Sequence, residues 1–388
     1  MAGGAGGPRA RMTPAAQAVR AQTTQDVAAA VTEAAARATP LRIVGRGHWL
    51  DAGPPARSAT PLALDALAGI VAYTPGDLTL TARAGTTLAD VAAVAGEHGQ
   101  WLALDPFGTE DGTIGATIAT ASAGPLAHAF GTPRDAALGL EVVTGDGAVV
   151  RTGGRVVKNV AGFDLTRLFT GSWGTLGVIT EVTVRLRARP EHDETWLAPL
   201  ADDRAVDAAC RAARTAALAP IALELLDGPL ASALGLGARA VLLVRLAGAA
   251  AAMRAQRDAL RTLGAAAPAP DDIWHRLRTV EPPGSTVLRL SHLPDRIGET
   301  WRAASMPDAW RHATPSRGIV RVILPPAADA EAIARAAAGR CTLIAERAPA
   351  PLWTGELAPM PNEELAARVR AAFDPAGILN AGLAAPDA

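Results

Sequence analysis

The stretch that decides the fold is residues 153–186, GGRVVKNVAGFDLTRLFTGSWGTLGVITEVTVRL. Gly171, Gly174 and Gly177 are separated by two residues each and lead into an apolar run from Val178 that alternates at Val182, Val184 and Leu186. This alternation predicts a half-buried strand. Glycines at fixed spacing before a strand indicate backbone that bends sharply or approaches a ligand closely.

The same stretch holds the one lysine of the chain, Lys158, among 37 basic residues. An ammonium on a flexible stem is not interchangeable with a guanidinium at a site for anions. We therefore interpret Lys158 as a candidate site residue, with chance survival on a solvated loop as the alternative.

Composition limits the remaining possibilities. A chain of 388 residues with 49% apolar residues has room for two domains with ample core. The formal net charge of −1 gives no reason to expect nucleic acid or an anionic membrane as a partner. Cys210 and Cys341 are too few for an iron–sulfur or zinc site, so no metal is expected, and a disulfide stays open.

The chain shows no targeting or membrane-spanning pattern. Its first residues, MAGGAGGPRARMTPAAQ, lack the apolar core of a signal peptide and predict a flexible tail over residues 1–19. No window approaches 18 apolar residues without charge or proline. The cytoplasm is the expected compartment, and attachment to the inner membrane through partners stays open.

A second glycine-rich loop lies near the start. The run from Leu41 to Val44 predicts a strand that ends in Gly45-Arg46-Gly47, where backbone N–H groups could converge on a diphosphate. The third glycine and the helix of the GxGxxG fingerprint are missing.

Other elements follow along the chain. Helices are expected over 24–37 and 85–100, paired strands over 62–74 and 79–84, a stretch of small residues over 113–124, and a hairpin over 142–151. Small residues in such a stretch let the backbone approach a flat ligand, although a helix packed on a sheet explains them equally well.

Taken together, these blocks resemble the flavin-binding domain of the vanillyl-alcohol oxidase and p-cresol methylhydroxylase (PCMH) family, over about residues 20–189. Within that family they look most like the FAD-binding subunits of bacterial glycolate oxidase, in which a KNVAGYD-like loop precedes a GS-GTLG turn. Phe163 replaces the usual tyrosine here, and Trp173 stands where related enzymes often have an acidic residue.

The resemblance implies bound FAD and a set of residues around it. His48 falls on a threonine-like position, so the expected FAD is non-covalent, with covalent attachment at His48 as the alternative. The implied cofactor-binding residues are Gly45, Arg46, Gly47, His48, Trp49, Pro106, Thr113, Ile114, Gly115, Ala119, Thr120, Ser122, Gly124, Lys158, Asn159, Gly177, Val178, Ile179 and Asn380.

After Arg189-Pro190 the pattern changes to strand-like runs that alternate with Ala/Arg-rich helical segments. The expected fold class is α+β: a two-subdomain PCMH-type FAD-binding domain (20–189), a ferredoxin-like α+β cap (190–370), and a C-terminal segment (371–388) that returns to the FAD domain. The expected cap strands are 195–200, 221–226, 241–246, 287–290, 319–324 and 342–346, and the expected helices include 203–216, 251–263 and 329–338.

The sequence contains few candidates for catalytic residues. The 2-hydroxy-acid relatives use a histidine-rich HGDGN-like motif in the cap, which is absent here, and the seven histidines are scattered. Lys158, His275 and His292 are the remaining candidates, and an entirely structural role for the histidines is the alternative.

Three hypotheses follow. The first is an FAD-binding subunit of a glycolate-oxidase-like complex that oxidises 2-hydroxy acids beside a paralogous flavin subunit and an iron–sulfur subunit. The second is a free-standing FAD-dependent oxidoreductase acting on an alcohol, sugar or hydroxy acid. The third is a non-catalytic interaction protein that has kept the fold.

Overall fold

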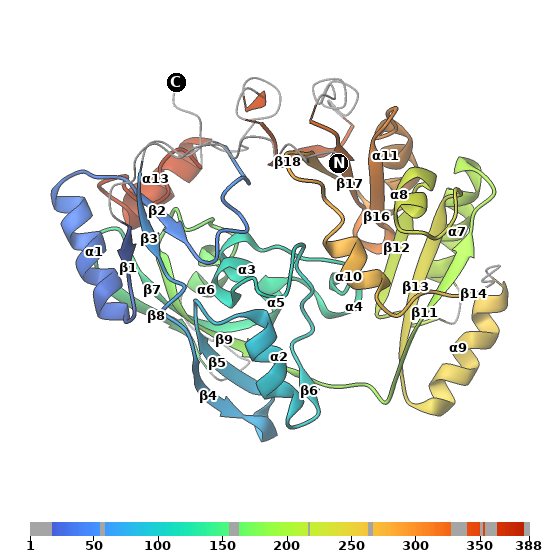
Figure 1. Ribbon diagram of the computed structural model, residues 1–388, viewed down its shortest axis with the longest axis horizontal. Helices are drawn as coiled ribbons and strands as arrows, with labels where there is room; N and C mark the ends of the chain where they lie inside the picture. Colours follow the sequence, from blue (N-terminus) through green and yellow to red (C-terminus); the bar gives the residue numbers. More distant parts are fainter. Residues whose placement is uncertain are drawn as a thin grey trace, which may run out of the picture.

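The computed structural model describes residues 18–54, 59–154, 163–215, 218–262, 267–326, 340–349, 352–353 and 363–383. These residues form two lobes that face each other across a central gap (Figure 1). The N-terminal lobe contains the strands and helices up to β10, together with the C-terminal helix α13, and the cap lobe contains β11 to β18.

The N-terminal lobe is built on two main sheets. A three-stranded parallel sheet has the order β1-β3-β2, and a five-stranded antiparallel sheet has the order β4-β5-β9-β7-β8. The elements are β1 (Val19–Arg20), α1 (Thr24–Ala36), β2 (Leu41–Val44), β3 (Thr60–Ala63), β4 (Ile70–Thr74), η1 (Pro75–Asp77), β5 (Thr79–Arg83), α2 (Leu88–Gly96), β6 (Gln100–Trp101), α3 (Ile114–Thr120), α4 (Ala127–Phe130), α5 (Pro133–Ala136), β7 (Ala137–Val143), β8 (Val149–Gly153), α6 (Leu165–Phe169), β9 (Val178–Arg185) and β10 (Arg187–Ala188).

The alternating residues from Val178 onward form a strand, as their pattern predicts. β9 occupies the centre of the five-stranded sheet, and Val182, Val184 and Leu186 are fully buried against α2 and α3. The glycines before it adopt conformations that side chains disfavour, with φ of 82° at Gly171 and 69° at Gly174.

One strand prediction is wrong. Residues 62–74 are not a single strand, because β3 ends at Ala63 in the parallel sheet and β4 begins at Ile70 in the antiparallel one. Only β4 pairs with β5. The turn between them, LDALAG, is apolar and contains a single glycine, so the sequence looks continuous.

The cap contains two ferredoxin-like units in one eight-stranded antiparallel sheet with the order β14-β11-β13-β12-β16-β17-β15-β18. If β11 to β14 are numbered 1 to 4, their order across the sheet is 4-1-3-2. If β15 to β18 are numbered in the same way, their order is 2-3-1-4, which is the same order read from the other edge. The elements are β11 (His192–Pro199), α7 (Asp203–Thr215), β12 (Ala222–Leu226), α8 (Gly228–Ala233), β13 (Val241–Gly248), α9 (Ala250–Thr262), β14 (Ala267–Pro268), α10 (Ile273–Arg278), β15 (Thr286–Ser291), η2 (Pro294–Arg296), α11 (Ile297–Ala303), β16 (Trp310–Thr314), η3 (Pro315–Arg317), β17 (Ile319–Leu324), β18 (Thr342–Arg347) and α13 (Glu363–Phe373) of the C-terminal segment.

The α+β class is confirmed, and the cap is a duplicated version of the expected ferredoxin-like unit. The helix expected over 329–338 lies outside the described residues. The sequence also missed β16, whose residues WRHAT are mostly polar. Alternate residues of the second unit's strands, such as Leu288, Leu290 and Val322, are buried in a core shared with α7, α9 and α11. Figure 1 shows α7 and α9 on the side of the sheet away from the N-terminal lobe.

The C-terminal segment packs on the N-terminal lobe. The Leu41 amide donates to the Ile378 carbonyl at 2.8 Å, and Leu379 pairs with Leu41 in a parallel bridge. Within the described part of the chain, no helix combines the length and the apolar character needed to cross a bilayer.

Candidate functional site

A narrow slot runs through the N-terminal lobe beside the loop that follows β2. Its walls come from that loop, from α3, from the turn before β9 and from the C-terminal segment. Twelve of the residues implied for FAD line it: Gly45, Arg46, Gly47, His48, Trp49, Thr113, Gly115, Ala119, Thr120, Gly177, Ile179 and Asn380. Segments separated by more than 300 residues in the sequence therefore converge on one space.

Arg42 on β2 also lines this slot, and the sequence reasoning missed it. Its Nη1 is buried and has no hydrogen-bond partner among the residues with described positions, and burial lowers the pKa of its guanidinium. A buried cation is stabilised by an anion, and a charge-assisted bond to a phosphate would supply one. The group therefore fits the diphosphate of FAD.

The glycines of the slot permit close packing of its walls. A Cβ on Gly115 would lie 2.6 Å from the Cβ of Ala84, and a Cβ on Gly177 would lie 2.4 Å from Val142 Cγ1. Gly47 has a φ of 85°, which turns the loop back toward the slot at little conformational strain.

Asn380 fixes the slot from the far end of the chain. Its Oδ1 accepts from the Ile43 amide at 2.8 Å, and its Nδ2 donates to the Trp173 carbonyl at 2.7 Å. It therefore holds the strand before the glycine loop against the turn that precedes β9.

Four of the implied residues line neither the slot nor the neighbouring cavity, and their role in binding FAD remains a prediction. Ile114 and Val178 are fully buried in the core. Gly124 packs so tightly that a Cβ would lie 2.1 Å from the Asp105 carbonyl oxygen. Pro106 lines neither the slot nor the neighbouring cavity described below, and its carbonyl accepts from Arg278 Nη1 at 3.2 Å. Lys158 and Asn159 lie outside the described residues.

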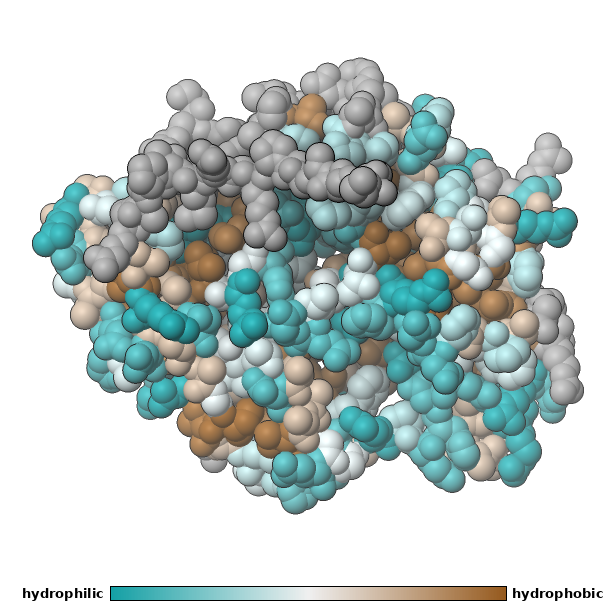
Figure 2. All heavy atoms as spheres, viewed as in Figure 1, coloured by the Kyte–Doolittle hydropathy of each residue, from teal (hydrophilic) through white to brown (hydrophobic). Residues whose placement is uncertain are grey.

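The slot opens into a larger cavity of about 880 Å³ between the lobes. Four residues line both spaces: Trp49, Thr120, Trp173 and Leu383. Ser122 lines the cavity but not the slot. The space-filling view shows a groove between the lobes, flanked by hydrophilic residues (Figure 2). Slot and cavity together form an elongated space, which suits a dinucleotide with a substrate beside it.

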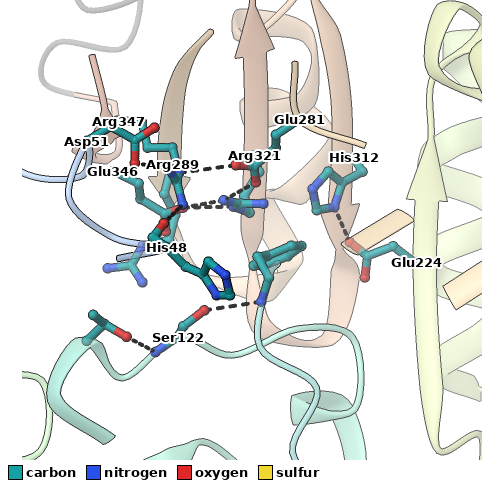
Figure 3. Close-up of polar contacts among 12 residues, drawn as sticks. His48, Asp51, Ser122, Glu224, Glu281, Arg289, His312, Arg321, Glu346 and Arg347 are labelled. Carbon is teal, nitrogen blue, oxygen red and sulfur yellow. Dashed lines mark hydrogen bonds and ion pairs between the residues drawn. The ribbon is translucent and has the colours of Figure 1, made fainter. Parts of the chain in front are cut away.

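The cavity wall on the cap side is one face of the eight-stranded sheet. Arg289, Arg321 and His312 lie directly opposite one another on β15, β17 and β16, with the register Arg289↔Arg321↔His312. Side chains of directly paired residues point to the same face. The three side chains therefore form a row that faces the N-terminal lobe (Figure 3).

His312 is held by a buried carboxylate. Its Nδ1 lies 2.6 Å from Glu224 Oε1, and Thr314 Oγ1 donates to Glu224 Oε2 at 2.9 Å. Both His312 and Glu224 are at most 2% exposed. With Nδ1–H donating to the carboxylate, Nε2 has a free lone pair, and it makes no hydrogen bond to any described residue. This is the arrangement of an oriented base.

Arg321 is clamped in position. Its Nε and Nη2 donate to Glu346 Oε2 at 2.9 and 2.6 Å, and its Cζ lies 3.5 Å from the centre of the Phe107 ring. Burial raises the pKa of the Glu346 carboxyl, but Arg321 and Arg289 outweigh it and hold this pKa below its ordinary value. The pair is therefore ionised, and within the described part of the chain Arg321 Nη1 has no hydrogen-bond partner.

Five of the described arginines line the cavity: Arg134, Arg289, Arg317, Arg321 and Arg370. Burial, followed by the neighbouring charge of Arg289, lowers the pKa of Arg317. No carboxylate of the described residues lies within ion-pair distance of Arg317. The excess of cations over Glu224 and Glu346 favours an anionic ligand.

The histidines chosen from the sequence lie elsewhere. His275 is exposed on α10, and His292 Nδ1 accepts from the adjacent Leu293 amide at 2.6 Å. Neither lines the slot or the cavity. A usable signal was present: Glu224, Arg289 and Arg321 are single charges inside runs of buried apolar strand residues, ALELL, TVLRLS and IVRVIL. Among the residues with described positions, no group of three His, Cys, Asp or Glu could hold a metal ion.

Comparison with known proteins agrees with this geometry. Residues 15–153 match the family model of the FAD binding domain. Glycolate oxidase subunit GlcE of Escherichia coli is 41% identical over 162 residues, which cover 41% of this chain and 46% of that protein. Glycolate oxidase subunit GlcD of Bacillus subtilis is 40% identical over 156 residues, which cover 39% of this chain and 33% of that protein.

The chain thus spans less than half the length of these two curated relatives. A crystal structure of p-cresol methylhydroxylase with substrate bound superposes with a TM-score of 0.73 at 17% identity, covering 95% of this chain and 88% of that one. The shared fold therefore extends through the cap. The N-terminal part of this chain therefore matches the FAD binding domain by sequence, and the chain shares its fold with p-cresol methylhydroxylase.

Proposed function

We propose that this chain is an FAD-dependent oxidoreductase that oxidises a 2-hydroxy acid, and that it works as a subunit of a glycolate-oxidase-like complex. Its similarity to two glycolate oxidase subunits supports the substrate class. The observation that carries the proposal is the His312–Glu224 pair, which shares one face of the cap sheet with a row of arginines.

The cofactor would lie along the slot. Arg42 and the Gly45–His48 loop would hold its diphosphate, and Lys158 and Asn159 remain proposed ligands. Bound FAD would accept the hydride that leaves C2 of the substrate. The remaining tasks, which are anion binding, orientation and removal of a proton, belong to the protein.

Each of these tasks has a candidate group in the cavity. Arg289 and Arg321 in the row, with Arg317 beside them in the cavity wall, would bind the substrate carboxylate through charge-assisted hydrogen bonds. His312 Nε2 would take the proton of the C2 hydroxyl, while Glu224 keeps the imidazole in the required tautomer and stabilises the imidazolium. Removal of this proton and of the hydride gives the 2-oxo acid.

The experiment is an anaerobic titration of the FAD-loaded protein with glycolate and with D-lactate. We expect loss of the oxidised flavin absorbance and formation of one 2-oxo acid per flavin. A folded chain that binds no FAD would refute the proposal, and a flavin that neither acid reduces would refute the substrate class. In the latter case the cavity would serve assembly or electron relay.

Membership of a complex is the finer part of the proposal. Co-purification with a paralogous flavin subunit and a cysteine-rich iron–sulfur subunit is the expected result, in the cytoplasm or at the inner membrane through those partners. Full turnover with an artificial electron acceptor and no partner would instead favour a free-standing enzyme.

A further inference from the structure

A continuous series of ion pairs connects the glycine loop of the slot to the arginine row of the cavity. Arg347, the last residue of β18, lies between the two (Figure 3). Arg347 itself lines neither the slot nor the cavity, so it would act on them only through the residues that it contacts.

On the loop side, Arg347 contacts three residues of the segment that follows Gly47. Its Nη1 pairs with the Asp51 carboxylate, its Nη2 donates to the His48 carbonyl at 3.0 Å, and its Cζ lies 4.9 Å from the centre of the Trp49 ring. Backbone contacts reinforce this docking, because the Gly53 amide donates to the Glu346 carbonyl at 3.0 Å.

On the cap side, the link passes through Glu281. Its Oε2 lies 3.3 Å from Arg347 Nε, and its Oε1 lies 2.8 Å from Arg321 Nη2. The same Arg321 nitrogen lies 2.6 Å from Glu346 Oε2. Except for Asp51, the side chains in this series are at most 17% exposed.

A shared carboxylate makes these positions interdependent. Glu281 divides its two oxygens between two guanidiniums, and Glu346 is also shared, with Arg289 at 3.7 Å. If Arg347 is removed, Glu281 has only Arg321 to neutralise it. In a buried site an uncompensated charge pulls strongly on its remaining partner, so Arg321 would turn away from the cavity.

We propose that Arg347 is a positioning residue that couples occupancy of the glycine loop to the geometry of the anion-binding row. This inference rests on the proposed function, because it takes FAD as the ligand of the loop and a carboxylate as the ligand of the row. An ordered loop fixes Arg347, Arg347 fixes Glu281, and Glu281 fixes the orientation of Arg321. FAD and the substrate anion therefore tighten each other's binding, by reciprocity of the coupling.

The test measures binding without turnover. FAD affinity is determined from flavin fluorescence, with and without oxalate, a dicarboxylate that has no C–H bond to oxidise. In the unmodified protein we expect oxalate to lower the FAD Kd about fivefold or more. Arg347→Met should raise the FAD Kd about tenfold and abolish the effect of oxalate, because both ends of the link are lost.

Three further variants locate the effect. Glu281→Gln should abolish the effect of oxalate and leave FAD affinity within about threefold, since it interrupts only the cap side of the link. Asp51→Asn, at an exposed residue that tolerates change, should weaken FAD binding and reduce the effect of oxalate. Arg302→Met is the matched control: Arg302 forms a 2.9 Å ion pair with Asp207 on the outer helices of the cap, and both measurements should stay unchanged.

The outcomes separate the two proposals. If the unmodified protein binds no FAD, both fail. If it binds FAD and oxalate independently, or if Arg347→Met and Asp51→Asn keep the full effect of oxalate, the positioning role is wrong and the proposed function stands.

Discussion

Asp105 is a buried carboxylic acid whose ionisation should change the stability of the fold with pH. It lies in the extended segment before Phe107, and both of its oxygens accept from the Leu126 amide, at 3.1 and 3.0 Å. Burial raises the pKa of this carboxyl from 3.8 to about 7, although Arg278 and the Leu126 amide oppose the rise. Below about pH 7 the folded protein therefore keeps Asp105 protonated.

The sign of the pH dependence follows. Between about pH 4 and about pH 7 the folded state keeps this proton and the unfolded state has lost it, so Asp105 makes the protein less stable as pH rises. A shift of about three pH units, at about 1.4 kcal/mol each, corresponds to about 4 kcal/mol. Asp105→Asn cannot ionise, so its stability relative to the unmodified protein should increase by about this amount across that range.

Urea unfolding of both proteins at several pH values between about pH 4 and about pH 8 measures this difference directly. The other titrating groups are the same in both proteins, so their contributions cancel in the difference between the two free energies of unfolding. Asp146→Asn is the control, because hydrogen bonds from Thr144 and the Ala148 amide lower the pKa of Asp146 in the folded protein, so its effect on stability should not vary between about pH 5 and about pH 8. A difference between Asp105→Asn and the unmodified protein that does not vary with pH would show that Asp105 is ionised in the fold.

Three further predictions concern the site. His312→Asn should lower the rate of flavin reduction by the hydroxy acid about 10²- to 10⁴-fold with little change in FAD affinity, as measured by anaerobic stopped flow; an unchanged rate would exclude His312 as the base. Arg317→Met should raise the KM for the hydroxy acid about tenfold or more and change kcat less, because it removes a contact to the substrate carboxylate. An equal rise in the KM for an uncharged alcohol would contradict this role. Arg42→Met should raise the FAD Kd about tenfold by equilibrium dialysis, with Arg37→Met, at an exposed pair with Glu33, as the control that stays unchanged.

The sequence was most informative where local pattern and structure coincide. The alternation from Val178 predicted β9, and the strand-loop pattern at 41–47 predicted the wall of the slot. Family resemblance then assembled segments that periodicity alone cannot bring together, such as Asn380 beside Ile43. The domain limits at residues 189 and 370 and the roles of Lys158 and Asn159 remain predictions.

The catalytic candidates could not be found by looking for clustered histidines. His312 is one scattered histidine in the sequence, and only strand pairing brings it beside Arg321 and Glu224. The pairing itself depends on β16, a strand whose polar residues concealed it. Long-range register is set by packing of whole strands, which no local window of sequence contains.

The duplicated cap explains why the reactive groups lie where they do. β12 and β16 join the two ferredoxin-like units, and they pair only at Leu225↔Ala313 and Leu226↔His312. In the first unit, α8, α10 and Leu126 cover this face of the sheet with an apolar core. The second unit leaves the same face open to the cavity, so its strands can present charges there. Glu224 lies at the boundary between the two units. The first unit, whose face is covered, buries the Glu224 carboxylate away from water, and the second unit supplies His312, which this carboxylate orients.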